Sequence, residues 1–515
     1  MDIQRSFLER LRLAHLEQWA EVPAMAFAAL LGIGLVYTTA TVLYRIFFHP
    51  LSRFPGPKVL AITDITSDWR SYIRGTWIHE VQALHREYGP VVRIGTNHLA
   101  LDGSVGWPTL AHRTGKPEFG KQPGFYFGQR DLSILGAEND MHRRQRRQLS
   151  HAFSDSALNE QGDLILKYVD MLVQQLETRA QKGETVNITD WMNFTTFDII
   201  GDLAVSTPFR CLEAGKYHPW VTNFFASIEG SAASRFVRFY PYLKPLVGLV
   251  KSRGDTGMDL RQIQMTMGIT QGRMALGVQK EGKKDFMTYM LRSNRDGEDG
   301  MSDMEILTNA PVLMGAGSET TATALAGFFY FLGTTPRAYQ RLVHEIRSAF
   351  RSEEEITLRY LAKLEYLQAC LEESLRLYPA VAITPPRICP GAEIDGKWVP
   401  QGTIISIHQY ATFRNPEHFA DPEVFVPERF LPAAHRLFEN KYASDNRAVF
   451  KPFSYGSRDC IGKNLAFAEM RAVVAKLLFR FDFQLAPGQE DWIKRQKTFV
   501  MWHKGALKLS FGKRS

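Results

Sequence analysis

The chain has 515 residues and is 45% hydrophobic and 12% aromatic, which is ample for a large folded core. Its formal net charge is +8, but no nucleic-acid-binding motif accompanies this charge, so we do not expect a nucleic-acid partner. The four cysteines are too sparse for a disulfide scaffold and form no CxxC pair, which fits a reducing compartment: Cys211, Cys370, Cys389 and Cys460.

The first predicted element is an apolar helix near the N-terminus. Residues 22–44 carry no charge and would span roughly 35 Å as a helix, enough to cross a bilayer. We predict a short segment at 1–21, a transmembrane anchor at 22–44, a proline-rich hinge at 45–57 and one large domain at 58–515, which no Ser/Gly-rich linker or repeat divides. Basic residues are nearly balanced across the run, so charge sets its orientation only weakly. A buried core helix is the alternative interpretation.

Most of the large domain has the periodicity of helices, with few strand signals. Residues 91–94 and 404–407 are β-branched runs between turn residues, and they predict short strands. The sequence therefore predicts a mainly α domain with a minor β-sheet.

A long helix is predicted between residues 302 and 333. Ser302 and Glu305 form a capping box at its start, and Gly333 lies at its end. Pro311 lacks an amide hydrogen, so we expect it to kink this helix.

The middle of this helix reads Ala-Gly-Ser-Glu-Thr-Thr over residues 316–321. Gly317 would let the backbone approach a flat cofactor. The Thr320 hydroxyl can bond back to a helix carbonyl or donate to a ligand, and Glu319 can relay protons from water. Taken alone, the same residues also fit a helix that breaks and restarts.

A second helix ends at Pro379 and carries Glu373 and Arg376 three residues apart. Residues at this spacing are neighbours on a helix surface and can form an ion pair. An isolated pair of this kind is an ordinary solvated bridge that stabilises a protein by a few tenths of a kcal/mol.

Residues 453–462 read Phe-Ser-Tyr-Gly-Ser-Arg-Asp-Cys-Ile-Gly and resemble FxxGxRxCxG, the haem-ligand loop of the cytochrome P450 superfamily. Five fixed residues at roughly 5% each over about 500 start positions give on the order of 10⁻⁴ chance matches. Gly456 and Gly462 permit turns that aim backbone amides at the Cys460 sulfur. The alternative is a buried structural cysteine in a glycine-rich turn.

The resemblance implies the cytochrome P450 fold, a haem-thiolate catalytic domain, and haem b with an axial thiolate from Cys460. It implies that Glu319 and Thr320, with Gly317, form the acid–alcohol pair that splits dioxygen. Further cofactor-binding positions that it implies are Phe453, Gly462, Arg458, Arg387, Arg146 and His142. His142 stands where the family often has tryptophan, and histidine titrates near neutrality.

The pair of Glu373 and Arg376 matches the family's ExxR motif. The resemblance implies that it locks with Arg429, which lies in the matching loop at residues 425–430. We class this triad as structural, supporting the side of the haem on which Cys460 lies.

The resemblance also implies partners and a location. We expect NADPH-cytochrome P450 reductase as the electron donor, with cytochrome b5 as an optional second one, because the sequence contains no flavin or dinucleotide-binding unit. A basic docking face is predicted at Arg143, Arg144, Arg147 and Lys463. The expected location is the endoplasmic reticulum membrane, single-pass, with a cytosolic catalytic domain. Residues 217–250 predict either a face that dips into lipid or ordinary core helices.

Several stretches resemble filamentous-fungal enzymes of specialised metabolism of the trichothecene hydroxylase type, among them residues 89–94, 149–154 and 460–466. This resemblance implies hydroxylation or epoxidation of an apolar terpenoid, polyketide or alkaloid in a mycotoxin-type pathway. The residues suggested by position for the substrate pocket are Phe125, Phe127, Val381, Ile383, Phe499 and Val500, with Tyr126 and Ala382 beside them. A haem-thiolate isomerase and a haem sensor are the alternatives, and Glu319 with Thr320 argues against both.

Overall fold

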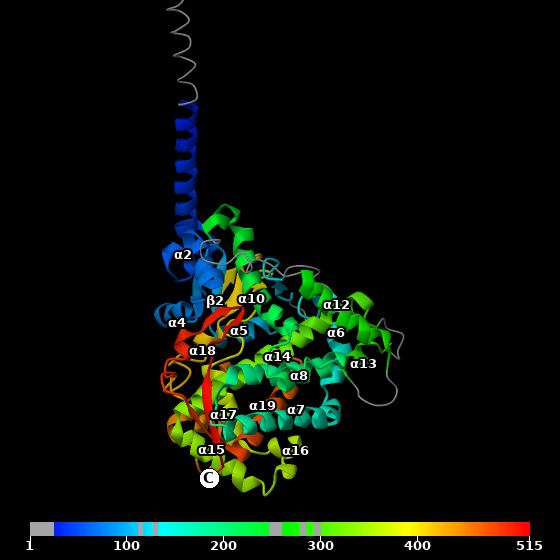
Figure 1. The fold of residues 1–515 in the computed structure, drawn as a ribbon. Helices are drawn as coiled ribbons and strands as arrows, with labels where there is room; N and C mark the ends of the chain where they lie inside the picture. Colours follow the sequence, from blue (N-terminus) through cyan, green and yellow to red (C-terminus); the bar gives the residue numbers. More distant parts are fainter. Residues whose placement is uncertain are drawn as a thin grey trace, which may run out of the picture.

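The computed structural model describes residues 25–111, 117–126, 132–246, 260–278, 285–292 and 300–514. Helices form most of it, and small sheets lie toward one side (Figure 1). The longer helices are α4 (Trp77–Tyr88), α6 (Asn139–Ser150), α7 (Asp155–Gln181), α8 (Ile188–Val205), α10 (Pro219–Phe239), α12 (Leu260–Ala275), α14 (Asp303–Thr334), α15 (Pro336–Ala349), α17 (Glu365–Leu377) and α19 (Lys463–Arg480). The shorter ones are α2 (Lys58–Ile62), α3 (Ile65–Asp68), α5 (Gly103–Leu110), α9 (Cys211–Ala214), α13 (Phe286–Met290), α16 (Leu358–Leu361) and α18 (Gln409–Thr412). The predicted mainly α fold is confirmed.

The largest sheet has the strand order β1-β2-β8-β5-β3. Its strands are β1 (Val91–Gly95), β2 (His98–Leu101), β8 (Ile404–Ile407), β5 (Arg387–Ile388) and β3 (Gly120–Lys121). Both strands expected from sequence, β1 and β8, are therefore confirmed, and β2 joins them. The smaller sheets are formed by β4 (Thr185–Asn187), β12 (Lys508–Lys513) and β9 (Phe481–Leu485); by β6 (Ala392–Ile394) and β7 (Lys397–Val399); and by β10 (Lys497–Phe499) and β11 (Met501–His503).

Helix α14 runs through the centre of the domain and has the ends that the sequence indicates. The Ser302 hydroxyl accepts a hydrogen bond from the Glu305 amide, and the Glu305 carboxylate accepts one from the Ser302 amide at 2.8 Å, so the capping box is present. The helix continues through Pro311 to Thr334.

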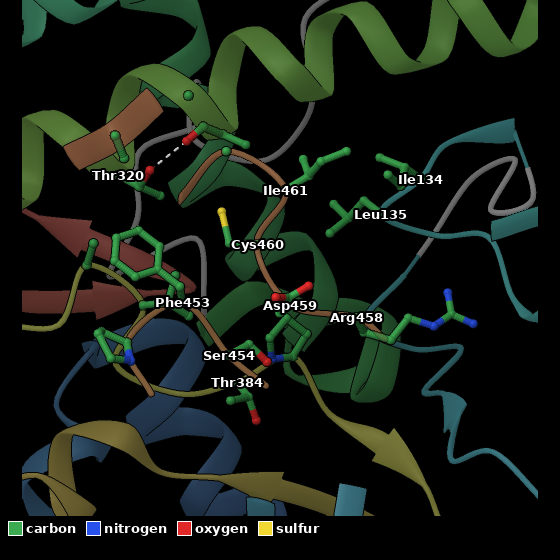
Figure 2. A pocket seen from close by; sticks show the side chains of 18 of the residues that line it. Ile134, Leu135, Thr320, Thr384, Phe453, Ser454, Arg458, Asp459, Cys460 and Ile461 are labelled. Carbon is green, nitrogen blue, oxygen red and sulfur yellow. Dashed lines mark hydrogen bonds between the residues drawn. The ribbon is translucent and has the colours of Figure 1, made fainter. Parts of the chain in front are cut away.

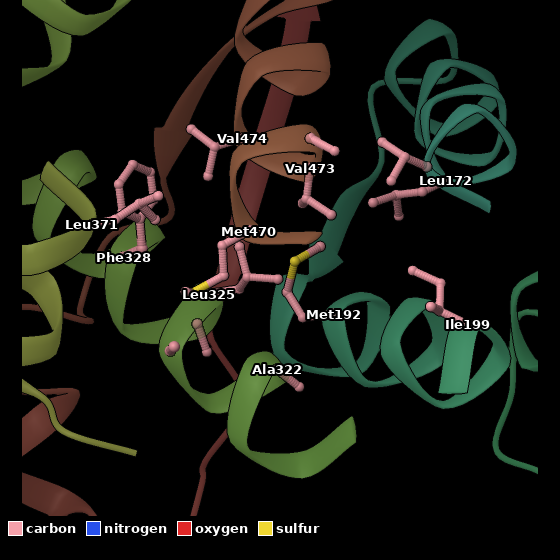
Figure 3. Close-up of a cluster of buried hydrophobic side chains, with 14 of the residues drawn as sticks. Leu172, Met192, Ile199, Ala322, Leu325, Phe328, Leu371, Met470, Val473 and Val474 are labelled. Atoms are coloured by element: carbon pink, nitrogen blue, oxygen red, sulfur yellow. The ribbon is translucent and has the colours of Figure 1, made fainter. Parts of the chain in front are cut away.

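The core forms where α14 packs against α8, α17 and α19. Figure 3 shows this packing, with Leu325 and Phe328 of α14 among side chains from the neighbouring helices. A Cβ added at Gly317 would lie 2.6 Å from the Ile200 side chain of α8. Gly317 therefore allows α14 to pack closely on α8, and it also lines the cavity described below.

The N-terminal helix Met25–Phe48 projects from the rest of the chain (Figure 1) and is long and apolar enough to cross a membrane by length and composition. It runs four residues beyond the predicted end of the anchor, into the predicted hinge. Hydrogen bonds then attach the hinge to the large sheet: the Arg93 side chain donates to the Arg45 carbonyl at 2.8 Å, and the Arg93 amide donates to Pro55 at 2.7 Å.

Candidate active site

One cavity of about 380 Å³ lies between α14 and the loop that carries Cys460. Figure 2 shows the Cys460 sulfur pointing into the space below the helix that bears Thr320. Hydrophobic side chains form much of the remaining wall, including Ile134, Leu313 and Val381. The structure thus brings together the cysteine loop and the middle of α14, which lie about 140 residues apart in the sequence.

The loop around Cys460 is held by its own backbone. Gly456 has a φ of 86°, a conformation that glycine adopts without steric cost. The Cys460 amide donates to the Phe453 carbonyl at 2.8 Å, and the Phe453 ring packs against Phe467 of α19. Gly462 has a φ of −89°, so its backbone does not require glycine, contrary to expectation.

Cys460 is exposed, and it lines the cavity, whereas the other three cysteines are buried. The surrounding protein atoms raise the pKa of its thiol, and a hydrogen bond from the Gly462 amide opposes this shift. Helix α19 begins three residues after Cys460, so its N-terminal dipole also favours an anionic sulfur. The local structure therefore offers both an accessible sulfur and groups that stabilise its thiolate.

Basic side chains collect at one end of the cavity. Arg458 donates to the Glu118 carboxylate at 2.7 and 3.1 Å, and Arg146 donates to the Asp459 carbonyl at 2.7 Å. Both predicted donors thus already have protein partners. The guanidinium of Arg387 has no hydrogen bond or ion pair with another described residue. Burial lowers the pKa of this guanidinium.

His142 also lines this end of the cavity. Burial, followed by the charges of Arg458, Lys121 and Arg146, lowers the pKa of His142 to about 3. The expectation that His142 titrates near neutrality is wrong, because the site around it is both buried and cationic. In its neutral form, the His142 ring can donate one hydrogen bond.

Thr320 and Glu319 point in different directions from α14. Thr320 lines the cavity, and its hydroxyl donates to the Ala316 carbonyl at 2.6 Å. Glu319 does not line the cavity; its carboxylate is buried and pairs with Lys504. Consecutive helix residues are separated by about 100° around the axis, so the two side chains cannot share one face.

The predicted triad of Glu373, Arg376 and Arg429 is assembled and buried. Arg376 donates two hydrogen bonds to the Glu373 carboxylate, at 2.7 and 2.8 Å, and Arg429 donates one at 3.2 Å. Arg429 also pairs with Asp445, and Arg376 donates to three backbone carbonyls. The ExxR pair is therefore part of a network in the core.

The six suggested wall residues differ in their placement. Val381 lines the cavity, and so does Tyr126, which follows Phe125 in the sequence. Four of the suggested residues do not line it: Phe125, Ile383, Phe499 and Val500. Phe127 lies outside the described residues. Phe125 instead lies under the guanidinium of Arg235, and Phe499 packs over Gly75. Val500 is 43% exposed in the turn between β10 and β11.

A model of the cytochrome P450 family matches residues 69–511. The chain belongs to the cytochrome P450 family. It is similar to cytochrome P450 monooxygenase astJ of Aspergillus oryzae, with 40% identity over 481 residues that cover 92% of this chain and 94% of the relative. It is also similar to averantin hydroxylase of Dothistroma septosporum, with 36% identity covering 93% of this chain and 90% of the relative. This P450 is therefore a monooxygenase-type oxidoreductase with relatives in fungal secondary metabolism.

The residues that line the cavity of this P450 fit haem. One wall presents a sulfur ligand, the opposite wall presents Thr320, and the basic end is suited to two propionates. Arg387 and Lys121 lie directly opposite each other in the β5–β3 pair, so two cations meet at this end. The chemistry of this donor set, one thiol and a cationic rim, is what a thiolate-ligated porphyrin requires.

Three titratable residues lie at or next to the cavity without having been predicted there from the sequence. Lys121 reaches the cavity only because β3 pairs with β5, and burial followed by the Arg387 charge lowers the pKa of Lys121 to about 7. Glu469 of α19 also lines the cavity; burial raises the pKa of its carboxyl well above the usual value, and its Oε2 has no hydrogen-bond partner among the described residues. Lys504 is far from Glu319 in sequence. No local sequence pattern indicates where these three residues lie in the fold.

Proposed function

We propose that this P450 inserts one oxygen atom from dioxygen into an apolar specialised metabolite, a terpenoid, polyketide or alkaloid, chiefly by hydroxylation or epoxidation. The observation that carries the proposal is the Cys460 sulfur facing Thr320 across a largely apolar cavity. Ligand sites of this type recognise substrates mostly by hydrophobic contact with a few polar groups. The similarity to averantin hydroxylase supports averantin as the first compound to examine.

The chain's own residues have distinct tasks in this proposal. Cys460 would hold the iron, and Arg387, Lys121 and His142 would hold the propionates. Bound haem with a thiolate ligand supplies the oxygen chemistry, because thiolate donates electron density and favours O–O cleavage. The Thr320 hydroxyl, which lines the cavity opposite Cys460, moves a proton at its Oγ1. The apolar wall excludes bulk water from the substrate.

We propose that electrons come from NADPH through a separate reductase, with cytochrome b5 as an optional donor. Arg143, Arg147 and Lys463 are exposed near the Cys460 loop, which supports docking of an acidic partner there. Arg144 leaves the predicted face, because it turns inward to pair with Glu305. The remaining basic residues would accelerate the encounter in a salt-dependent way.

We also propose a single-pass location in the endoplasmic reticulum membrane, with the large domain in the cytosol. The N-terminal helix supports this by its length and apolar surface. The segment after α10 adds exposed apolar residues, with Tyr242 70% and Leu246 45% exposed, whereas Trp220 and Phe236 are core residues. Residues such as Trp220 and Phe236 therefore belong to core helices, and we propose that the exposed apolar residues after α10 contact lipid.

The proposal is tested with purified protein, a fungal reductase, NADPH and isotopically labelled dioxygen. We expect the reduced protein to show the CO spectrum of thiolate-ligated haem, and averantin or a related polyketide probe to gain one labelled oxygen atom by mass spectrometry. A folded, haem-loaded protein without that spectrum would overturn the assignment. Turnover of a probe without dioxygen and NADPH would point instead to an isomerase.

We expect Thr320→Ala to retain haem but to lower the product formed per NADPH by about tenfold, since a positioned proton-transfer group typically contributes this much or more. The missing reducing equivalents should appear as hydrogen peroxide. Thr334→Ala is the matched control, because Thr334 makes the same kind of bond to a preceding carbonyl at the end of α14. Equal coupling in Thr320→Ala and wild type would remove Thr320 from the mechanism.

A further inference from the structure

Glu319 and Lys504 form a buried ion pair directly behind the cavity wall. Glu319 is 2% exposed and the Lys504 side chain 3%. The Lys504 ammonium donates to the Glu319 carboxylate and to the Thr323 hydroxyl at 2.8 Å, and this hydroxyl donates to Glu319 Oε1 at 3.2 Å. Glu319, Thr323 and Lys504 are thus all bonded to one another, and neither of the two α14 residues lines the cavity.

The second carboxylate oxygen of Glu319 is unsatisfied. Glu319 Oε2 is buried and has no hydrogen-bond partner among the residues that the structure describes. Burial of a carboxylate oxygen without a hydrogen-bond partner is costly. Glu319 is therefore held by one oxygen and left with the other available, one residue before Thr320.

The C-terminal hairpin fixes the position of Lys504. Lys504 follows β11, and the next residue, Gly505, donates to Gln496 at 3.0 Å and accepts from the Trp492 indole at 3.0 Å. On the other side of Lys504, the Trp502 indole donates to the Pro379 carbonyl at 2.8 Å. Because Pro379 immediately precedes Ala380 and Val381, which line the cavity, the same hairpin contacts both the substrate wall and the acid.

The charged forms of Glu319 and Lys504 stabilise each other. Burial raises the pKa of Glu319 and lowers that of Lys504, while the opposite charge of the partner counteracts both shifts. The other charged or titratable groups that act on the pair are His503, Asp190, Tyr217 and Tyr378, and the Phe225 ring lies 5.9 Å from the ammonium. Removal of either partner therefore leaves the remaining group buried without its counter-charge.

We propose that Lys504 is a positioning residue for Glu319: it holds the carboxylate against the C-terminal hairpin, so that proton supply to the cavity requires this pair to open. On opening, Glu319 takes a proton from water and turns toward Thr320, and Lys504 keeps its own proton. The inference rests on the proposed monooxygenase function, for which Glu319 is the acid of the acid–alcohol pair.

The first test is a thermal unfolding cycle with Lys504→Met, Glu319→Gln and the double variant of the haem-loaded protein. Lys504→Met leaves a buried carboxylate without its partner, so we expect its unfolding midpoint to fall below that of wild type. Adding Glu319→Gln removes the stranded charge and should restore part of the loss. A double variant less stable than Lys504→Met would show that the two residues act independently, which overturns the proposal.

The second test measures proton supply without a substrate. With reductase and NADPH, we measure the hydrogen peroxide formed per NADPH and the effect of deuterium oxide on the rate of NADPH oxidation. We expect Lys504→Met to change the peroxide yield at least twofold and to alter the solvent isotope effect, as Glu319→Gln does, with no further change in the double variant.

Lys476→Met is the matched control, because Lys476 is also buried and pairs with a carboxylate, that of Asp170 on α7, and neither residue lines the cavity. It should lower stability but leave the peroxide yield and isotope effect at wild-type values. If Lys504→Met also leaves both values unchanged, the positioning role is excluded. Absence of the thiolate CO spectrum in wild type would instead refute the proposed function, and the unfolding cycle would still test the pair.

Discussion

Replacement of Cys460 by serine is expected to abolish the thiolate-type CO spectrum and reduce turnover to background. The serine hydroxyl is similar in size but is not deprotonated near neutral pH, so neither the Gly462 amide nor the start of α19 has an anion to stabilise. The loop backbone should persist, because its hydrogen bond from residue 460 to Phe453 uses main-chain atoms. The CO difference spectrum and NADPH-dependent product formation measure the outcome.

The matched control for this experiment is Cys389→Ala. Cys389 is fully buried between β5 and β6, in the cluster around the large sheet and away from the Cys460 loop. Its replacement should lower stability modestly and retain both spectrum and turnover. A thiolate spectrum that survives in Cys460→Ser but is lost in Cys389→Ala would reverse the ligand assignment.

The parts of this molecule that the sequence predicted well are those defined by neighbouring residues. The capping box of α14 involves residues 302 and 305, and the ExxR pair lies on one helix. The cysteine loop depends on backbone bonds within residues 451–462. In each case the interaction partners are close in the chain, so the local pattern contains most of the information.

The parts that the sequence did not predict depend on contacts between distant segments. Lys504 lies 185 residues from Glu319, and Glu118 lies 340 residues from Arg458. A charged residue has many possible partners at such separations, and only the packing of helices and strands selects one. For the same reason the close packing of Gly317 on Ile200 could not be predicted, since the side chain that fills the space beside the glycine comes from α8.

The substrate wall was predicted least well. Val381 and Ile383 both follow the end of α17, but only Val381 lines the cavity, and Phe125 and Phe499 are large apolar residues that lie elsewhere. Any large apolar side chain gains by burial, whether in a cavity wall or in the core, so hydrophobicity does not distinguish the two. Phe125 instead packs beneath Arg235, and Phe499 packs against η3 (Trp69–Arg74) and Gly75.

Glu373→Gln is expected to destabilise the protein by about 3–5 kcal/mol, the usual cost of removing one partner from a buried ion pair. The Glu373 carboxylate accepts from Arg376, Arg429 and the Val426 amide, and all three side chains of the triad are at most 1% exposed. Glutamine keeps a similar shape and one acceptor but leaves two cations facing a neutral group. We therefore expect a lower unfolding midpoint and a preparation largely devoid of haem, measured by thermal unfolding and by the haem-to-protein ratio.

Asp285→Asn separates this effect from a general loss of stability. Asp285 pairs with Arg273 in an equally buried bridge between α12 and α13, with side chains 0% and 1% exposed. Both variants should lose a comparable amount of stability, but the folded fraction of Asp285→Asn should retain haem. The reason is that Arg429, through Asp445, connects the triad to the segment that leads into the Cys460 loop, a connection that the Asp285 bridge lacks. Equal haem content in the folded fractions of the two variants would reduce the triad to an ordinary core ion pair.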